Sequence, residues 1–156
     1  MRSRILLWAA LAAFAIDQIS KYLVVHVMRV AEGNIDVLPP LLVFKYGENR
    51  GINFGLFQGD SDTARWVLIG ISLAVAIGVL IWLMRTTPSK LMLFCGGLLI
   101  GGALGNVVDR VLYGYVLDFL NMSCCGLNNP FVFNLADVFI FAGAFGLVLF
   151  DGKKPS

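Results

Sequence analysis

The sequence predicts an all-α integral membrane protein with four transmembrane helices and a small extracytoplasmic β-sheet between the first two helices. Of its 156 residues, 58% are hydrophobic and only 14% are charged. The mean hydropathy is +0.82, and this composition is far from that of a soluble globular domain. Four apolar runs are long enough to be spans, and the length fits a single membrane-embedded domain over residues 1–156. The net charge of +2 is too small to indicate nucleic-acid binding.

The first span is expected over residues 5–27. Arg2 and Arg4 precede it, and the Ala-Phe-Ala at 13–15 also fits a cleaved secretory signal peptide. However, the apolar character resumes after Lys21 and gives about 20 residues, which is the length of a membrane span. We therefore expect an uncleaved first helix.

Residues 28–65 differ in character from the spans. Two prolines at 39–40 mark a turn, an apolar run follows at 41–44, and residues 52–57 alternate in hydropathy. Alternation with period two is typical of a half-buried strand. We expect short extramembrane strands that lie on the bilayer surface with one apolar face toward it.

The remaining spans are expected at 66–84, 91–110 and 133–150. The second contains no charged residue, and the third carries a glycine at every fourth position from Gly97 to Gly105. This spacing lets another helix approach the backbone closely.

The basic residues predict the orientation. Both chain ends and the loop between the second and third spans fall on one side, with six basic residues against one acid, whereas residues 28–65 contain four basic residues and five acids. Since basic residues concentrate on the cytoplasmic side, both termini should be cytoplasmic. The six are Arg2, Arg4, Arg85, Lys90, Lys153 and Lys154.

Acids and amides concentrate in an apolar stretch near the end of the chain. At 1.5 Å rise per residue, Asp17 and Lys21 lie about 18–24 Å from the start of the first helix, which places them in the outer half of the bilayer with this polar set. Ionisable groups in such a setting are costly and mark a functional site. The set comprises Asn106, Asp109, Arg110, Asp118, Asn134 and Asp137.

Several of these residues also fit purely structural roles. Asp17 and Lys21, four residues apart, form a neutralising pair within one helix equally well. Asp109 and Arg110 are suited to closing a helix end near lipid headgroups, and Asn134 to capping the fourth helix.

Asp137 is harder to explain structurally, because it lies inside a span with no basic residue nearby in sequence. Its partner should be an acid or an amide from the third helix or the following loop, which contains Asp118. Two close carboxyls in a poorly hydrated site cannot both ionise, and a pair sharing one proton is what an aspartic peptidase requires. Asp109 is an alternative to Asp118 as the partner of Asp137. However, we expect the neighbouring Arg110 to keep Asp109 ionised, which makes Asp118 the better partner.

Metal and cofactor chemistry is not expected. The single histidine, His26, and the three cysteines are not arranged in ligand spacing. Two further classes remain as alternatives: a small proton-coupled transporter or channel subunit, which also uses intramembrane acids and bases, and a non-catalytic lipid-binding scaffold.

Five motifs in order resemble the lipoprotein signal peptidase family, also called signal peptidase II, and together they cover nearly the whole chain. They are Asp17-Gln-Ile-Ser-Lys21, Asn49-Arg-Gly51 with Phe54-Gly55, the stretch from Gly101 to Arg110, Val116-x-Asp118-Phe119, and Phe133-Asn-Leu-Ala-Asp137.

The resemblance implies an enzyme of the bacterial cytoplasmic (inner) membrane, active near its outer face. It implies that diacylglyceryl-prolipoproteins are cleaved immediately before the lipidated cysteine by two aspartates, with no metal or other cofactor. The catalytic pair would be Asp118 and Asp137, and we expect a monomer whose other partners are membrane lipids. Ile52-Asn53 stand where the family usually has small residues, so the resemblance does not determine the shape of the groove that would hold the substrate. Supporting or substrate-contacting positions would be Asp17, Lys21, Asn49, Gly51, Asn106, Asp109, Arg110, Asn134 and Ala136.

Overall fold

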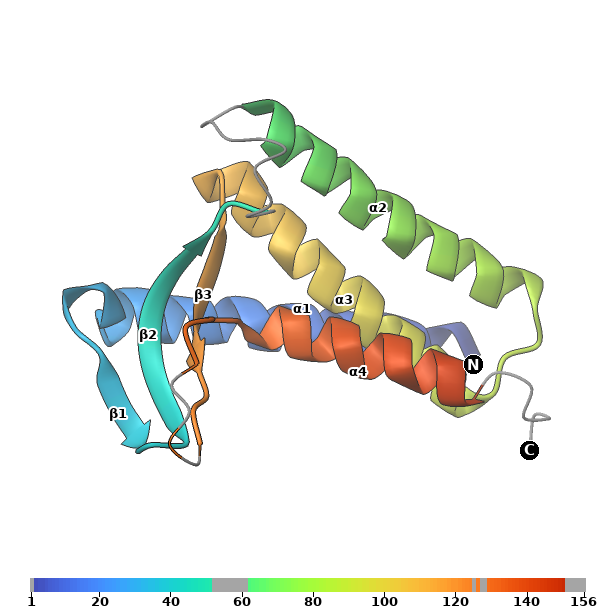
Figure 1. The fold of residues 1–156 in the computed structure, drawn as a ribbon. Coiled ribbons are helices and arrows are strands. Elements are labelled where there is room, and N and C mark those ends of the chain that lie inside the picture. The colour runs from blue at the N-terminus through green and yellow to red at the C-terminus, as the bar shows by residue number, and fades with distance from the viewer. Residues whose placement is uncertain (1, 52–61, 125, 127–128, 151–156) are drawn as a thin grey trace.

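Four α-helices and a small sheet make up the computed structural model, which describes residues 2–51, 62–124, 126 and 129–150. The sheet stands at one end of the helices, near Lys21 and Tyr113; we call this the sheet end (Figure 1). The opposite end contains the start of α1, the turn from α2 to α3 and the end of α4. The helices are α1 (Arg2–Lys21), α2 (Asp62–Arg85), α3 (Lys90–Tyr113) and α4 (Leu135–Phe150), and α1 continues as a π-helix over Tyr22–Val27, followed by a 3₁₀ turn at Val30–Glu32.

Three helical segments are long and apolar enough to cross a membrane: Ser3–Val27, Asp62–Arg85 and Lys90–Tyr113. The fourth, α4, is equally apolar in character but has 16 residues. Relative to the sequence-based ranges, α2 begins at Asp62 rather than at residue 66, and α3 extends to Tyr113 rather than ending at residue 110.

The central helix is α3, which packs against each of the other three. Adjacent glycines make two of these contacts possible. A Cβ at Gly101 would collide with the carbonyl oxygen of Ala10 in α1, and a Cβ at Gly102 would lie 2.6 Å from the carbonyl oxygen of Ala136 in α4. The expectation that the glycines permit close helix packing is confirmed, and the partner of Gly97, Gly101 and Gly105 is α1.

The sheet contains three antiparallel strands in the order β1 (Ile35–Leu38), β2 (Leu42–Asn49) and β3 (Val116–Asn121). The predicted small sheet is therefore present, but its third strand comes from the segment between α3 and α4. We expected Asp118 in a loop, whereas it lies on β3 opposite Gly47 of β2. The alternating stretch 52–57 lies outside the described residues.

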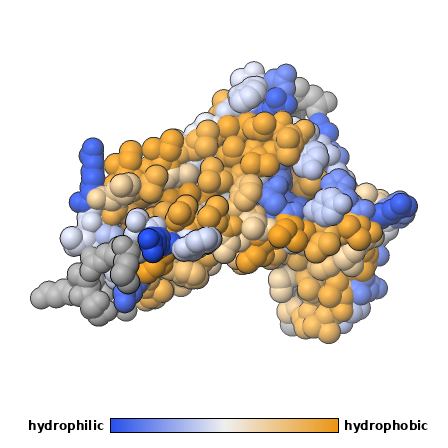
Figure 2. All heavy atoms as spheres, turned by 180° about the vertical axis from the view of Figure 1, so that it is seen from behind, coloured by the Kyte–Doolittle hydropathy of each residue, from blue (hydrophilic) through white to orange (hydrophobic). Residues whose placement is uncertain are grey.

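The outer surface of the helices is strongly apolar. Trp8 of α1 is 67% exposed and Phe141 of α4 is 77% exposed. Hydrophobic residues cover most of the face in Figure 2, and hydrophilic atoms gather toward its ends. An exposed apolar surface this extensive is expected of a protein that lies in lipid.

Candidate active site

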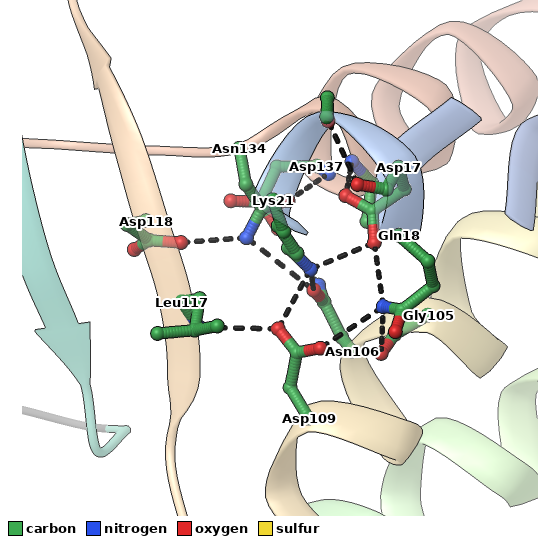
Figure 3. Close-up of polar contacts among 12 residues, drawn as sticks. Asp17, Gln18, Lys21, Gly105, Asn106, Asp109, Leu117, Asp118, Asn134 and Asp137 are labelled. Atoms are coloured by element: carbon green, nitrogen blue, oxygen red, sulfur yellow. Dashed lines mark hydrogen bonds and ion pairs between the residues drawn. The ribbon is translucent and has the colours of Figure 1, made fainter. Parts of the chain in front are cut away.

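Polar side chains from α1, α3, β3 and the start of α4 converge at the sheet end (Figure 3). Most of them are almost fully enclosed although they carry charges or amides. The buried members are Asp17, Lys21, Asn106, Asp109, Asp118 and Asn134.

Lys21 is the centre of a buried ion triad. Its Nζ lies 2.7 Å from Asp17 Oδ2 in the same helix and 2.7 Å from Asp109 Oδ2 in α3. The predicted pair between Asp17 and Lys21 is present, and the ion-pair partner of Asp109 is Lys21 rather than Arg110, which we expected to hold it. The Arg110 guanidinium instead donates to the backbone carbonyl of Asn106 at 3.4 Å.

The two carboxylates of this triad also bind backbone groups of other elements. Asp17 Oδ1 accepts a hydrogen bond from the Ala136 N–H in the first turn of α4 at 2.8 Å. Asp109 Oδ2 accepts one from the Leu117 N–H of β3 at 3.1 Å. The triad therefore fixes the positions of α4 and β3, the elements that carry Asp137 and Asp118.

Gln18 belongs to this network, although sequence reasoning did not select it. Its Nε2 donates to Asp109 Oδ1 at 2.9 Å and to the Gly105 carbonyl at 3.3 Å. A glutamine beside Asp17 inside a span was itself a signal, because an uncharged polar group in lipid also needs a partner.

Two asparagines have their amide orientation set by their neighbours. Asn106 Oδ1 accepts from Lys21 Nζ and Asn134 Nδ2, both at 3.3 Å, so its Nδ2 faces Asp137 Oδ1 at 2.9 Å. Asn134 Oδ1 accepts from the Asp137 N–H at 2.9 Å, which is the capping interaction that we considered, and its Nδ2 donates to Asp118 Oδ1 at 2.5 Å. Each amide thus presents an N–H to one oxygen of one acid.

Asp137 lies close enough to Asp118 to affect the pKa of the Asp118 carboxyl. Burial raises the pKa of Asp118, and the neighbouring carboxylate of Asp137 raises it further, to about 7. Hydrogen bonds from Asn134 and Asn49 act in the opposite direction. A carboxyl with this pKa is about half protonated at pH 7 and keeps its proton at lower pH.

Asn49 is the last residue of β2, and Gly51 follows it by two positions. The Asn49 side chain hydrogen-bonds Asp118 and its Oδ1 also accepts from the Gly51 N–H at 3.1 Å. Gly51 has φ 102°, which favours glycine, and a Cβ there would collide with Leu68. Glycine is therefore required at this turn.

The charges do not balance between the two halves of the site. Lys21 is already shared by Asp17 and Asp109, so the only other cation of the cluster is Arg110, which lies within electrostatic range of Asp137, Asp109 and Asp118. Among the described residues of the cluster, four carboxyls thus face two cations, which favours a proton on one of the acids.

Access to the site is on the side of Asp137 and Arg110. These two residues are partly exposed, whereas the other charged members are at most 3% exposed. Within the residues that the structure describes, no group of three His, Cys, Asp or Glu side chains is placed to hold a metal ion. The arrangement is suited to acid–base chemistry by two coupled carboxyls on a group that enters from this side.

The sequence and the fold are also similar to those of known proteins. A family model described as signal peptidase (SPase) II matches residues 9–151. The lipoprotein signal peptidase of Methylorubrum extorquens (strain PA1) is 41% identical over 148 residues, covering 95% of this chain and 85% of that protein. That of Nostoc sp. (strain PCC 7120 / SAG 25.82 / UTEX 2576) is 38% identical, covering 99% and 93%. A solved bacterial membrane enzyme is 26% identical with a TM-score of 0.78, covering 96% of this chain and 93% of that one.

Proposed function

Because this chain belongs to the signal peptidase II family, it is a peptidase of lipoprotein signal peptides in a bacterial membrane, and we propose that it acts by aspartic catalysis with Asp118 and Asp137. We propose further that it cleaves diacylglyceryl-modified prolipoproteins immediately before the lipidated cysteine. The observation that carries the catalytic assignment is the electrostatic coupling of these two carboxyls, each held by an asparagine amide on one oxygen.

The two acids have different roles in this mechanism. Asp118, which keeps its proton, donates a hydrogen bond to the scissile carbonyl oxygen. Asp137, as carboxylate, takes a proton from the attacking water, whose oxygen bonds to the carbonyl carbon. When the tetrahedral intermediate collapses, the C–N bond breaks and a proton from the pair passes to the leaving amine of the cysteine. The burial of Asp118 and the amide held on Asp137 support this division.

The supporting residues act through position. Lys21 with Asp17 and Asp109 holds α4 and β3 in register. Asn49, at the end of β2, and Arg110, at the accessible side, are the groups best placed to meet the extended peptide near the scissile bond.

We place both termini in the cytoplasm and the site at the outer face of the inner membrane, as the basic residues indicate. A transported proton would need polar groups along the whole path. On the central helix α3, by contrast, the residues from Leu91 to Gly105 carry no charge, which favours a peptidase over a transporter.

The direct test is incubation of the purified protein with one prolipoprotein in two forms, diacylglyceryl-modified and unmodified. Mass spectrometry should find a product that begins with the lipidated cysteine, and only from the modified form. Equal cleavage of both forms, or cleavage at another bond, would contradict the proposed specificity.

A further inference from the structure

The end of the helices opposite the acids has an apolar groove that the peptidase chemistry does not use. It lies between the start of α1, the end of α2 and the start of α3, and has a volume of about 260 Å³. We call its buried and half-buried leucines, Leu6, Leu80, Leu83 and Leu93, the floor, and its exposed lining residues, which include Ser3 and Thr87, the rim. We propose that this groove binds one acyl chain of an anionic phospholipid.

The shape and lining of the groove fit a hydrocarbon chain. Leu83 and Leu93 are 2% and 6% exposed, so the floor belongs to the packed interior. Pockets for drug-sized ligands measure roughly 300–1,000 Å³, so this groove takes part of a chain rather than a whole lipid. An apolar surface that faces a bilayer gains contacts when an acyl chain fills it.

The charges beside the groove favour an anionic headgroup. Arg4 is one residue from Ser3, Arg85 lies between the lining residues Met84 and Thr86, and Lys90 begins α3. All three side chains are exposed, and in the described part of the chain none of them forms an ion pair.

Two hydroxyls near the rim already have backbone partners. The Thr86 hydroxyl donates to the Trp82 carbonyl at 3.0 Å, and the Ser89 hydroxyl accepts from the Met92 N–H at 3.2 Å. The exposed basic side chains, together with the hydroxyls of Ser3 and Thr87, are the groups placed to meet a phosphate. Given the orientation proposed above, the lipid belongs to the cytoplasmic leaflet, where anionic lipids attract basic residues.

The test uses the full-length chain in a mild non-ionic detergent, with phosphatidylglycerol or phosphatidylcholine of identical acyl chains added at increasing concentration. Native mass spectrometry should show one phosphatidylglycerol per chain. Its Kd should be at least about fivefold below that of phosphatidylcholine, since one basic side chain near a membrane surface has about this effect on an anionic lipid.

Two variants separate the charge from the groove. Arg85→Gln with Lys90→Gln leaves only Arg4 of the three basic residues and should reduce the preference for phosphatidylglycerol over phosphatidylcholine at least about fivefold. The matched control, Arg29→Gln with Lys45→Gln, removes the same net charge from exposed positions near the sheet end and should keep the preference. Thr87→Phe fills the rim of the groove without changing the charge, and it should raise the Kd of both lipids at least about fivefold.

The proposal fails if Arg85→Gln with Lys90→Gln leaves the preference undiminished, or if the control pair reduces it equally. Undiminished binding of both lipids by folded Thr87→Phe would also overturn it. If Thr87→Phe does not fold, the exposed charge pair still decides the outcome. Cleavage measured on the same samples tests the peptidase proposal separately, because the groove and the two acids lie at opposite ends of the helices.

Discussion

Replacing Lys21 with methionine removes the only cation that touches both Asp17 and Asp109 in the described structure. Each carboxylate lies 2.7 Å from Lys21 Nζ, and Asp17 and Asp109 are 0% and 1% exposed. Methionine fills a similar volume but leaves two buried acids without their shared cation. Breaking a buried ion pair by removing one partner costs about 3–5 kcal/mol of unfolding free energy, so we expect a loss at least this large.

The assay is denaturant or thermal unfolding of the purified protein in detergent, followed by tryptophan fluorescence. Glu32→Gln is the matched control, since it breaks an ion pair with Arg29 in which both side chains are 70% exposed; it should cost less than about 1 kcal/mol. The triple variant Asp17→Asn, Lys21→Met and Asp109→Asn removes all three charges together and should recover most of the stability. If Lys21→Met unfolds at the same denaturant concentration as the unsubstituted protein, the account of the triad as the support of the site is refuted.

Three further predictions concern pH, packing and metal. Since burial and Asp137 raise the pKa of Asp118 to about 7, kcat/KM should be retained below this pH and fall as the pH rises through it. Asn49→Ala removes a hydrogen bond that lowers the pKa of Asp118, so this fall in kcat/KM should move to higher pH. A shift of the fall to lower pH would count against the assignment. The Cβ added by Gly101→Ala would collide with the Ala10 carbonyl, so this variant should lose about 1–3 kcal/mol of unfolding free energy. Gly78→Ala is the control, because a Cβ there has nothing within 4 Å, and its stability should be unchanged or slightly higher. Equal effects of the two variants would contradict the packing described for α3. Cleavage should survive excess EDTA, and activity lost in EDTA and restored by zinc would overturn the aspartic mechanism.

Much of the helical arrangement could be predicted because its signals are local. Four apolar runs predicted the four helices, and glycines four residues apart in α3 predicted a close approach of another helix, which is α1. The spacing of Asp17 and Lys21 gave the pair within α1, because side chains four residues apart meet on one helical face.

The strand that carries Asp118 could not be recognised from its pattern. In β3 every residue from Val116 to Phe119 is buried, so the alternation that identifies a half-exposed strand is missing. Its partner β2 is also distant in the sequence, and single-sequence patterns carry no information on such pairing.

The ion-pair partner of Asp109 could not be predicted, for a related reason. Arg110 is adjacent in sequence, but neighbouring residues on a helix point about 100° apart and do not face each other. Lys21, 88 positions earlier in the printed sequence, reaches Asp109 because α1 packs closely on α3. The ion triad is therefore a consequence of helix packing rather than of local sequence.

The central claim is that Asp118 and Asp137 act as one catalytic pair. The measurement that tests it most directly is single-turnover cleavage of a lipidated prolipoprotein by Asp118→Asn, Asp137→Asn, the double variant and Asp109→Asn, with Asp36→Asn on exposed β1 as the control. Each single variant of the pair should fold, bind substrate and lose on the order of 100- to 10,000-fold or more in rate. The double variant should lose little more, since the acids act as a unit. Asp109→Asn should affect chiefly stability or substrate binding. If folded Asp118→Asn cleaves at a near-normal rate while folded Asp109→Asn is inactive, the pair is Asp109 with Asp137 and the account is contradicted.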